Sequence, residues 1–183
     1  SPEFKKANSA VVMLRPQYKD GLPEIGSLIA IYKTVEQMIE EGKVLSAATP
    51  GYGGVAEALF KMCVGNHVGL QLSNDLNFND LFKPAYGSVI LELLDPSAGE
   101  FLGFTTVDYT LEAGNEMIDL AKLQEKWEAK LEPVFPYRKA GPTVPALEHD
   151  CPANKRVAPA VRLATPRVII PVFPGTNCEY DTA

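Results

Sequence analysis

The prolines of this chain are unevenly placed, and they separate stretches that can hold regular structure from one that cannot. Seven of the 15 prolines stand between Glu132 and Pro166. Proline lacks a backbone donor and restricts the residue before it, so neither a helix nor a central strand can continue through this stretch. We predict a folded domain over 1–135, an extended linker over 136–166 and the beginning of a second domain over 167–183.

The first 135 residues alternate short apolar runs with longer segments of helical spacing. A turn of hairpin-compatible composition at 95–99 is expected to join two of the strands antiparallel. Strands mixed with helices, one hairpin and few βαβ spacings favour an α+β fold, with helices covering a mixed, mainly antiparallel sheet. The expected strands are 10–14, 43–48, 68–72, 88–94 and 101–107. The expected helices are 23–41, 55–64 and 116–131, with a short helix or ordered connection at 74–82.

The helix expected to begin at Pro23 has the most regular apolar spacing. Pro23 suits a first helical turn, Glu24 lies near the positive end of the helix dipole, and Gly42 is a typical stop. We expect its apolar residues to form the buried stripe: Ile25, Leu28, Ile29, Tyr32, Val35, Met38 and Ile39.

Charge and cysteine content narrow the classes of function. A formal net charge of -6 and a pI near 5.0 argue against nucleic-acid binding, and no run of like charges suggests a membrane-surface patch. Cys63, Cys151 and Cys178 are odd in number and far apart, which argues against a structural zinc site and fits a reducing compartment. With neither a signal peptide nor a long apolar span, the expected location is the cytoplasm.

A glycine-rich turn between the second strand and the second helix is the one local pattern that indicates chemistry. The candidate phosphate- or nucleotide-binding residues are Thr49, Gly51, Gly53, Gly54 and Val55. Such a turn offers free N–H groups and the positive end of a helix dipole, and Gly53 is expected to need a positive φ. The lysine and hydroxyl residue of a P-loop are missing, so a tight turn that is merely rich in glycine remains the alternative.

Other polar residues give no catalytic set. His67 is interpreted as a surface or capping residue, and Glu112, Glu116 and Asp119 as the solvated start of a helix. His149 and its neighbours resemble metal ligands in type but stand in the linker, so we expect no metal site. No nucleophile, base and orienting group can be matched, and we assign no catalytic residue.

The segment 167–173 (RVIIPVF), followed by Pro174–Gly175, is typical of the first strand of a parallel sheet. We interpret the chain as a piece of a longer protein that ends just inside a second domain. Six mostly apolar residues favour burial, so this strand is expected to add to an exposed sheet edge of this domain or of a second molecule, with self-association as a consequence. Cys178 follows directly and is interpreted as structural, because a nucleophile elbow would lie on a later strand.

These two regions together resemble a known family. Residues 167–181 (RVIIPVFPGTNCEYD) resemble the start of the glutaminase domain of phosphoribosylformylglycinamidine synthases. The region before it is similar to the last synthetase domain of their long single-chain form, in the aminoimidazole-ribotide-synthetase superfamily. There, a turn of the pattern S-A-H-D-x-S-D-G-G stands where this chain has 46–58 (SAATPGYGGVAEA), and the Gly65–Asn66 turn and the approach at 81–89 also match.

The resemblance implies a reaction, cofactors and partners for the parent protein. Formylglycinamide ribonucleotide, ATP and glutamine would be converted to formylglycinamidine ribonucleotide, with Mg²⁺ on the phosphates and the other synthetase and glutaminase domains as partners. Ala48, Thr49, Gly51 and Tyr52 replace the polar residues of the family turn, which implies a non-catalytic copy. We therefore expect this piece to be structural or an auxiliary nucleotide site, inactive and without cofactor by itself. The alternatives are a non-enzymatic packing or linker module, or a domain of another ATP-dependent member of the superfamily.

Overall fold

The computed structural model describes residues 1–96, 98–136, 164–165 and 167–182. The chain divides into two compact units, Ser1–Lys139 and Ala140–Ala183. Nearly all of the predicted linker, including the histidine and cysteine at 149 and 151, lies outside the described residues.

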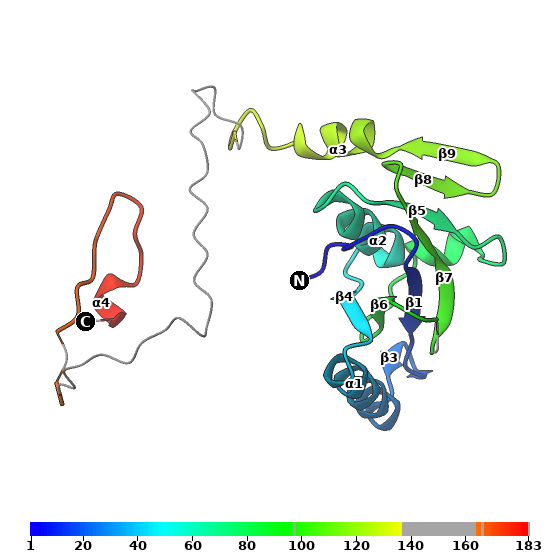
Figure 1. The fold of residues 1–183 in the computed structure, drawn as a ribbon, viewed down its shortest axis with the longest axis horizontal. Coiled ribbons are helices and arrows are strands. Elements are labelled where there is room, and N and C mark those ends of the chain that lie inside the picture. Colours follow the sequence, from blue (N-terminus) through cyan, green and yellow to red (C-terminus); the bar gives the residue numbers. More distant parts are fainter. Residues whose placement is uncertain (97, 137–163, 166, 183) are drawn as a thin grey trace. The chain divides into compact units, whose positions relative to one another are not determined.

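The first unit is built on a seven-stranded sheet in the order β4-β6-β1-β7-β5-β8-β9 (Figure 1). The β5–β8 pair is parallel and the other neighbouring pairs are antiparallel, so the predicted mixed, mainly antiparallel α+β fold is confirmed. The strands are β1 (Ala10–Leu14), β4 (Val44–Ala48), β5 (Gly69–Leu72), β6 (Val89–Leu93), β7 (Glu100–Thr106), β8 (Thr110–Ala113) and β9 (Glu116–Asp119).

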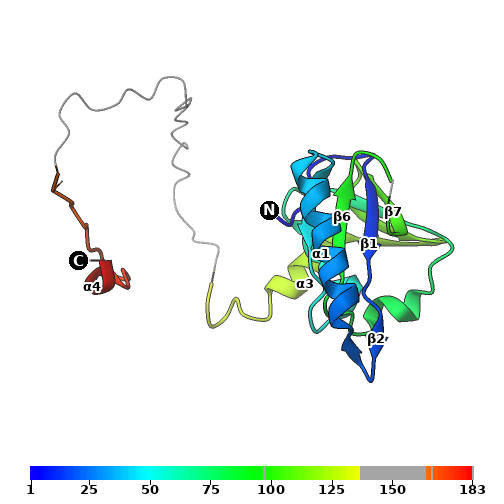
Figure 2. The same ribbon diagram turned by 90° about the horizontal axis from the view of Figure 1, so that it is seen from below.

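Helices lie on both faces of this sheet. On one face, α1 (Ile25–Glu40) packs against β1 and β6, and Figure 2 shows it running alongside β6. The other face carries α2 (Gly54–Val64), the 3-10 helix η1 (Phe78–Phe82) and α3 (Leu120–Glu128). A short hairpin of β2 (Tyr18–Lys19) and β3 (Leu22–Pro23) precedes α1.

Side-chain alternation along the central strands divides the core in two. Val12 and Leu91 belong to the cluster that includes Val35 and Met38 of α1. Val11 and Ile90, next to them in the sequence, belong to the larger cluster under α2. Strands that are apolar on both faces gain most by lying in the middle of a sheet covered on both sides.

The predicted hairpin between 88–94 and 101–107 is wrong in its pairing. Both segments are strands, but β1 lies between them: Val12 is opposite Leu91 of β6 and opposite Phe101 of β7. The connection at 94–99 is longer than a two-residue hairpin turn and can step across one strand. Inserting β1 there buries its apolar residues on both faces.

The predicted helix over 116–131 is also wrong in its first part. Residues 110–119 form the hairpin β8–β9, which turns at Gly114 with φ +62°, and helix α3 begins only at Leu120. The carboxylate of Asp119 caps α3 by accepting hydrogen bonds from the N–H groups of Ala121 and Lys122 at 3.0 and 3.2 Å. The cap satisfies donors that the first helical turn leaves unpaired, so the helix starts there.

Helix α1 is confirmed in extent, but two details differ from the prediction. Pro23 belongs to β3, and Glu24 is the N-cap residue. Of the expected stripe only Val35 and Met38 are buried, whereas the side chain of Ile25 is 73% exposed. The helix therefore packs on the sheet chiefly through its C-terminal half.

The second unit shows no strand among its described residues. Among the described residues the segment 167–173 has no ladder partner, and Ile169 is 88% exposed, so the expected pairing with an edge of this domain is not seen. Pairing with a second molecule stays a prediction. A lone extended segment is stabilised only when a neighbouring strand accepts its hydrogen bonds. Here Phe173 instead forms a turn, donating its N–H to Oγ1 of Thr176 and accepting from the N–H of the same residue, both at 2.9 Å, before the four-residue α4 (Glu179–Thr182).

Candidate functional site: the glycine-rich turn before α2

The glycine-rich turn joins β4 to α2, and its last glycine is required by packing. Gly54 has φ +71°, and a Cβ built there would lie 2.6 Å from the carbonyl oxygen of Leu81 and 2.7 Å from that of Lys83. Glycine therefore allows the backbone around η1 to approach the start of α2. The glycine-rich turn and η1 are therefore packed closely against each other.

The turn already uses two of the N–H groups that were predicted to bind an anion. Gly53 donates its N–H to Oε2 of Glu57 at 2.8 Å. Gly54 donates to the carbonyl oxygen of Gly51 at 3.1 Å. Val55 lies in the first turn of α2, where N–H groups lack partners within the helix.

Glu57 thus supplies an internal anion at the start of α2. Its other oxygen, Oε1, is 2.6 Å from Nζ of Lys61 one turn further along the helix. The hydrogen bond from Lys61, and after it the one from Gly53, holds the pKa of the Glu57 carboxyl below its usual range. An incoming phosphate would have to displace this carboxylate, because two anions cannot share the same donors.

Gly53 itself differs from the prediction. Its φ is −81°, so the positive φ expected there is found at Gly54 instead. A Cβ at Gly53 would still be crowded, at 2.5 Å from Oε2 of Glu57. Thr49 and Gly51 are exposed, and they remain candidates without a described ligand contact.

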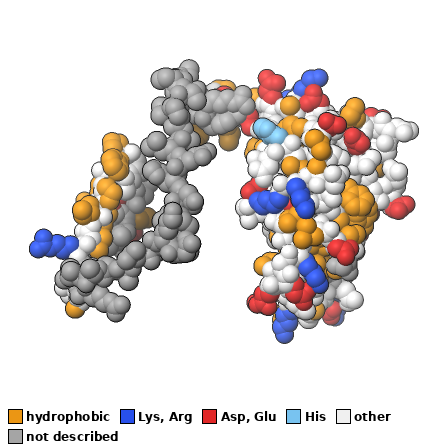
Figure 3. Space-filling view, viewed as in Figure 1, with side chains coloured by type: hydrophobic (Ala, Val, Ile, Leu, Met, Phe, Trp, Pro, Cys, Tyr) orange, Lys and Arg blue, Asp and Glu red, His pale blue; other side chains and the backbone are white. Residues whose placement is uncertain are grey.

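An apolar groove opens beside the turn and was not predicted. Its volume is about 580 Å³, and it lies between α2, η1, the β8–β9 hairpin and α3. Phe60 and Trp127 meet edge to face in its wall, with ring centroids 5.7 Å apart. On the visible face of the described residues, apolar, acidic and basic side chains are interspersed (Figure 3). Trp127 and Leu123 of α3 and Ile118 of β9 line this groove and are all partly exposed.

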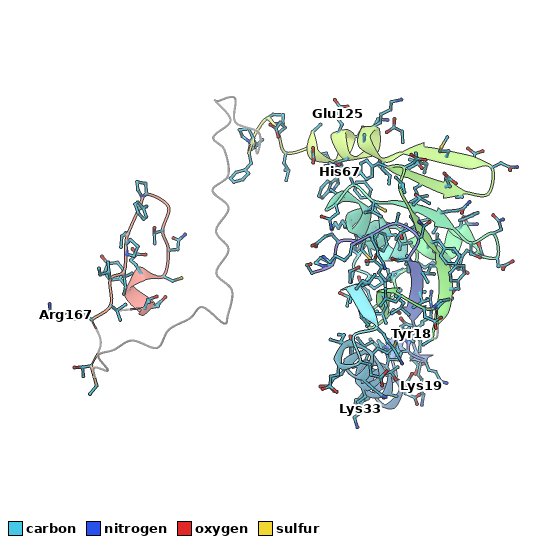
Figure 4. The ribbon with its side chains drawn as sticks, viewed as in Figure 1. Tyr18, Lys19, Lys33, His67, Glu125 and Arg167 are labelled. Carbon is cyan, nitrogen blue, oxygen red and sulfur yellow. The ribbon has the colours of Figure 1, made fainter. Side chains whose placement is uncertain are left out.

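The remaining sequence candidates do not assemble into a catalytic set. His67, labelled beside α3 in Figure 4, is exposed with φ +53°, and its ring lies 4.8 Å from that of Tyr109. Cys63 is buried in the core, and burial raises the pKa of its thiol to about 12. Among the described residues, no group of three or more His, Cys, Asp or Glu side chains could hold a metal ion, and none of the helices is long and apolar enough to cross a membrane.

A buried carboxylate outside the turn was missed altogether. Glu92 of β6 has no exposed surface, and its Oε2 accepts hydrogen bonds from the N–H of Lys5 and the hydroxyl of Ser46, both at 2.8 Å. Its Oε1 accepts from the N–H of Lys6 at 3.2 Å. We call these backbone hydrogen bonds from Lys5 and Lys6 to Glu92 the N-terminal clamp. Phe4, the residue before it, is fully buried and donates its N–H to the carbonyl oxygen of Met62. Phe4 therefore anchors the N-terminal segment in the core.

Comparison with known proteins finds partial similarity to phosphoribosylformylglycinamidine synthases in sequence and in fold. No protein-family model matches the chain. It is 32% identical over 104 residues to the phosphoribosylformylglycinamidine synthase subunit PurL of Methanocaldococcus jannaschii, covering 52% of this chain and 14% of that protein. The phosphoribosylformylglycinamidine synthase II structure of Thermotoga maritima superposes with a TM-score of 0.51 at 13% identity, over 80% of this chain and 29% of that one. T. maritima PurL in complex with FGAR gives 0.53 at 12% identity, over 85% and 32%.

The class defined by this fold is an α+β domain, with a mixed, mainly antiparallel sheet and helices on both faces. Within that class, the chain has a fold like that of PurL, the phosphoribosylformylglycinamidine synthase. The chain spans between 14% and 32% of the length of these three proteins. It therefore corresponds to a minor part of each of them.

Proposed function

We propose that this chain is a domain of a phosphoribosylformylglycinamidine synthase of the long single-chain form. The parent protein converts formylglycinamide ribonucleotide, ATP and glutamine to formylglycinamidine ribonucleotide. The observation that carries the proposal is the 32% identity to M. jannaschii PurL over 104 residues, together with a PurL-like fold. The resemblance of 167–181 to a glutaminase domain supports the single-chain form.

Within that enzyme we assign this domain a structural role. The polar residues of the family turn are replaced, and Glu57 occupies the N–H of Gly53 from within the chain. The internal carboxylate satisfies the start of α2 without a ligand. The domain therefore supports its neighbours, the other synthetase domains and the glutaminase domain, by packing.

An auxiliary nucleotide site at the turn is the second candidate, favoured by the N–H of Val55 in the first turn of α2. ATP supplies the phosphoryl group that activates the amide oxygen, and T. maritima PurL has been solved in complex with ADP. With Glu57 in place, the turn of this chain does not fit a phosphate, and the residues described offer no carboxylate cluster for Mg²⁺. The chemical steps of the reaction are therefore expected to take place in the other domains of the parent protein.

Genetic complementation tests the proposed reaction. The full parent gene is expressed in a purine auxotroph that lacks its own phosphoribosylformylglycinamidine synthase. We expect growth without added purines, and loss of that growth when residues 10–135 are deleted in frame. Failure of the intact gene to restore growth, with the protein present at normal level, would argue for another member of the superfamily or a purely non-enzymatic module.

A further inference from the structure

A second cleft lies away from the glycine-rich turn, where β1 ends. It has a volume of about 620 Å³, which is within the range of small-molecule sites. The hairpin β2–β3, the segment around η1 and the start of β7 contribute its walls. Tyr18 marks this end of the unit in Figure 4.

The walls of the cleft are joined by hydrogen bonds. The hydroxyl of Tyr18 donates to the carbonyl oxygen of Tyr86 at 2.9 Å, which ties the hairpin to the segment after η1. The side chain of Asn77 accepts from the N–H of Asn79 and fixes the start of η1. The cleft is therefore formed before any ligand arrives, and ligand binding does not have to order it.

One wall carries a cation and an anion that are close but not hydrogen-bonded. Nε of Arg15 lies 3.7 Å from Oε2 of Glu100, beyond normal hydrogen-bond length. Nη2 of the guanidinium donates one weak hydrogen bond, to Sδ of Met13 at 3.9 Å. A guanidinium has five donors arranged to bind a carboxylate with two parallel bonds, and most of that capacity is unused here.

The other wall repeats the pairing of charges. Nζ of Lys83 is 2.6 Å from Oδ1 of Asp80, in an exposed pair of the kind that contributes little to stability. With Arg15 and Glu100 this gives two cations and two carboxylates around one cleft. The charges cancel, so neither a phosphate nor a simple cation meets a net attractive potential. A molecule that carries both signs can pair with both.

We propose that this cleft, defined by Arg15, Tyr18, Asp80, Lys83, Tyr86 and Glu100, binds a small zwitterion of the α-amino-acid class. Arg15 binds the carboxylate through its planar fork, and Glu100 accepts hydrogen bonds from the ammonium. The rings of Tyr18 and Tyr86 contact an apolar or aromatic side chain. This binding site does not depend on the reaction proposed above, so the experiments that follow test it independently of that reaction.

Three related probes test this assignment on the full 183-residue chain. L-phenylalanine carries both charges, 3-phenylpropanoate lacks the ammonium, and phenethylamine lacks the carboxylate. Amide chemical shifts of 15–21 and 76–86 are followed during each titration. We expect saturable shifts with L-phenylalanine and affinities lower by at least about tenfold for the other two, because each loses a charge-assisted hydrogen bond.

Variants identify the groups that bind. Arg15→Gln should weaken L-phenylalanine at least about tenfold and leave phenethylamine unchanged, and Glu100→Gln should weaken L-phenylalanine and leave 3-phenylpropanoate unchanged. Lys33→Gln, on the exposed side of α1, is the matched control and should alter none of the three. Equal affinity for the three probes, stronger binding of inorganic phosphate, or no saturable shift in the cleft would overturn the proposal.

Discussion

Replacing Glu92 by glutamine tests whether a buried charge or its hydrogen bonds dominate the stability of the first unit. The carboxylate accepts three hydrogen bonds, two of them from the backbone of Lys5 and Lys6, and no lysine or arginine side chain is bonded to it in the described structure. Glutamine has nearly the same shape but only one acceptor oxygen. Its NH₂ group must therefore face one of the donors.

The expected change in the free energy of unfolding follows from the number of hydrogen bonds that are weakened or lost. An oxygen kept at the Oε2 position retains two bonds, each weakened by about 1 kcal/mol on losing the charge, and the N–H of Lys6 left unpaired costs about 1–3 kcal/mol. Relief from burying a charge offsets part of this cost. We expect Glu92→Gln to lower the free energy of unfolding by about 2 kcal/mol, or roughly 6 °C in Tm.

Urea unfolding followed by circular dichroism measures the loss, and amide hydrogen exchange locates it. Exchange at Lys5 and Lys6 should accelerate more than exchange in α1, because the clamp holds the N-terminal segment. Glu36→Gln, exposed on α1, is the control and should change stability by less than about 0.5 kcal/mol. An unchanged or increased stability of the Glu92 variant would show that the desolvation of the charge outweighs its hydrogen bonds, and would refute this reasoning.

Three further changes have expected outcomes. Phe4→Ala should cost about 3–5 kcal/mol in urea unfolding, as for a core aromatic; a loss below 1 kcal/mol would mean that the N-terminal segment packs only loosely. Gly54→Ala should cost about 3 kcal/mol because it combines a positive φ with backbone contacts at 2.6 and 2.7 Å, whereas Gly51→Ala, with open space around it, is the matched control; equal losses would contradict the geometry. Glu57→Gln should raise the affinity for ADP at least about tenfold by calorimetry if the turn is a latent anion site, and unchanged affinity would leave only the structural role. Because the pKa of the Glu57 carboxyl is lowered on folding, its contribution to stability is present at neutral pH and is lost as the pH falls through the acid range in which this carboxyl takes up a proton. Acid unfolding of the unmodified 183-residue chain should therefore depend on pH more steeply than that of the Glu57→Gln variant.

Local pattern was enough to predict most elements of the first unit. The runs at 10–14, 43–48 and 88–94 are strands, and the helical spacing before Gly42 is α1, because alternation and period reflect the environment of each segment. The order of strands was not predictable in the same way. Pairing β1 between β6 and β7 is a long-range choice, made by burying an apolar strand on both faces.

The candidate turn shows a similar limit. Two adjacent glycines at 53 and 54 do not reveal which of them takes the positive φ, because that depends on the carbonyl groups of η1 that pack against the turn. Glu57 stands in the first turn of α2, where an acidic side chain can accept from the free N–H groups of the helix start, and this is visible in the sequence. The role of Glu92 could not be predicted from the sequence, because its hydrogen-bond donors at Lys5 and Lys6 are distant in the sequence and approach it only in the folded structure.

The most direct test of the account is the reaction of the purified parent protein. Formylglycinamide ribonucleotide, glutamine, ATP and Mg²⁺ are supplied together, and formylglycinamidine ribonucleotide and ADP are quantified by mass spectrometry. The account predicts the two products in equal amounts, and retained activity for Gly53→Ala in this domain as long as the protein stays folded. No amidine product from an active ATPase, or loss of the reaction in a folded Gly53→Ala protein, would contradict the assignment of a synthase with a structural domain here.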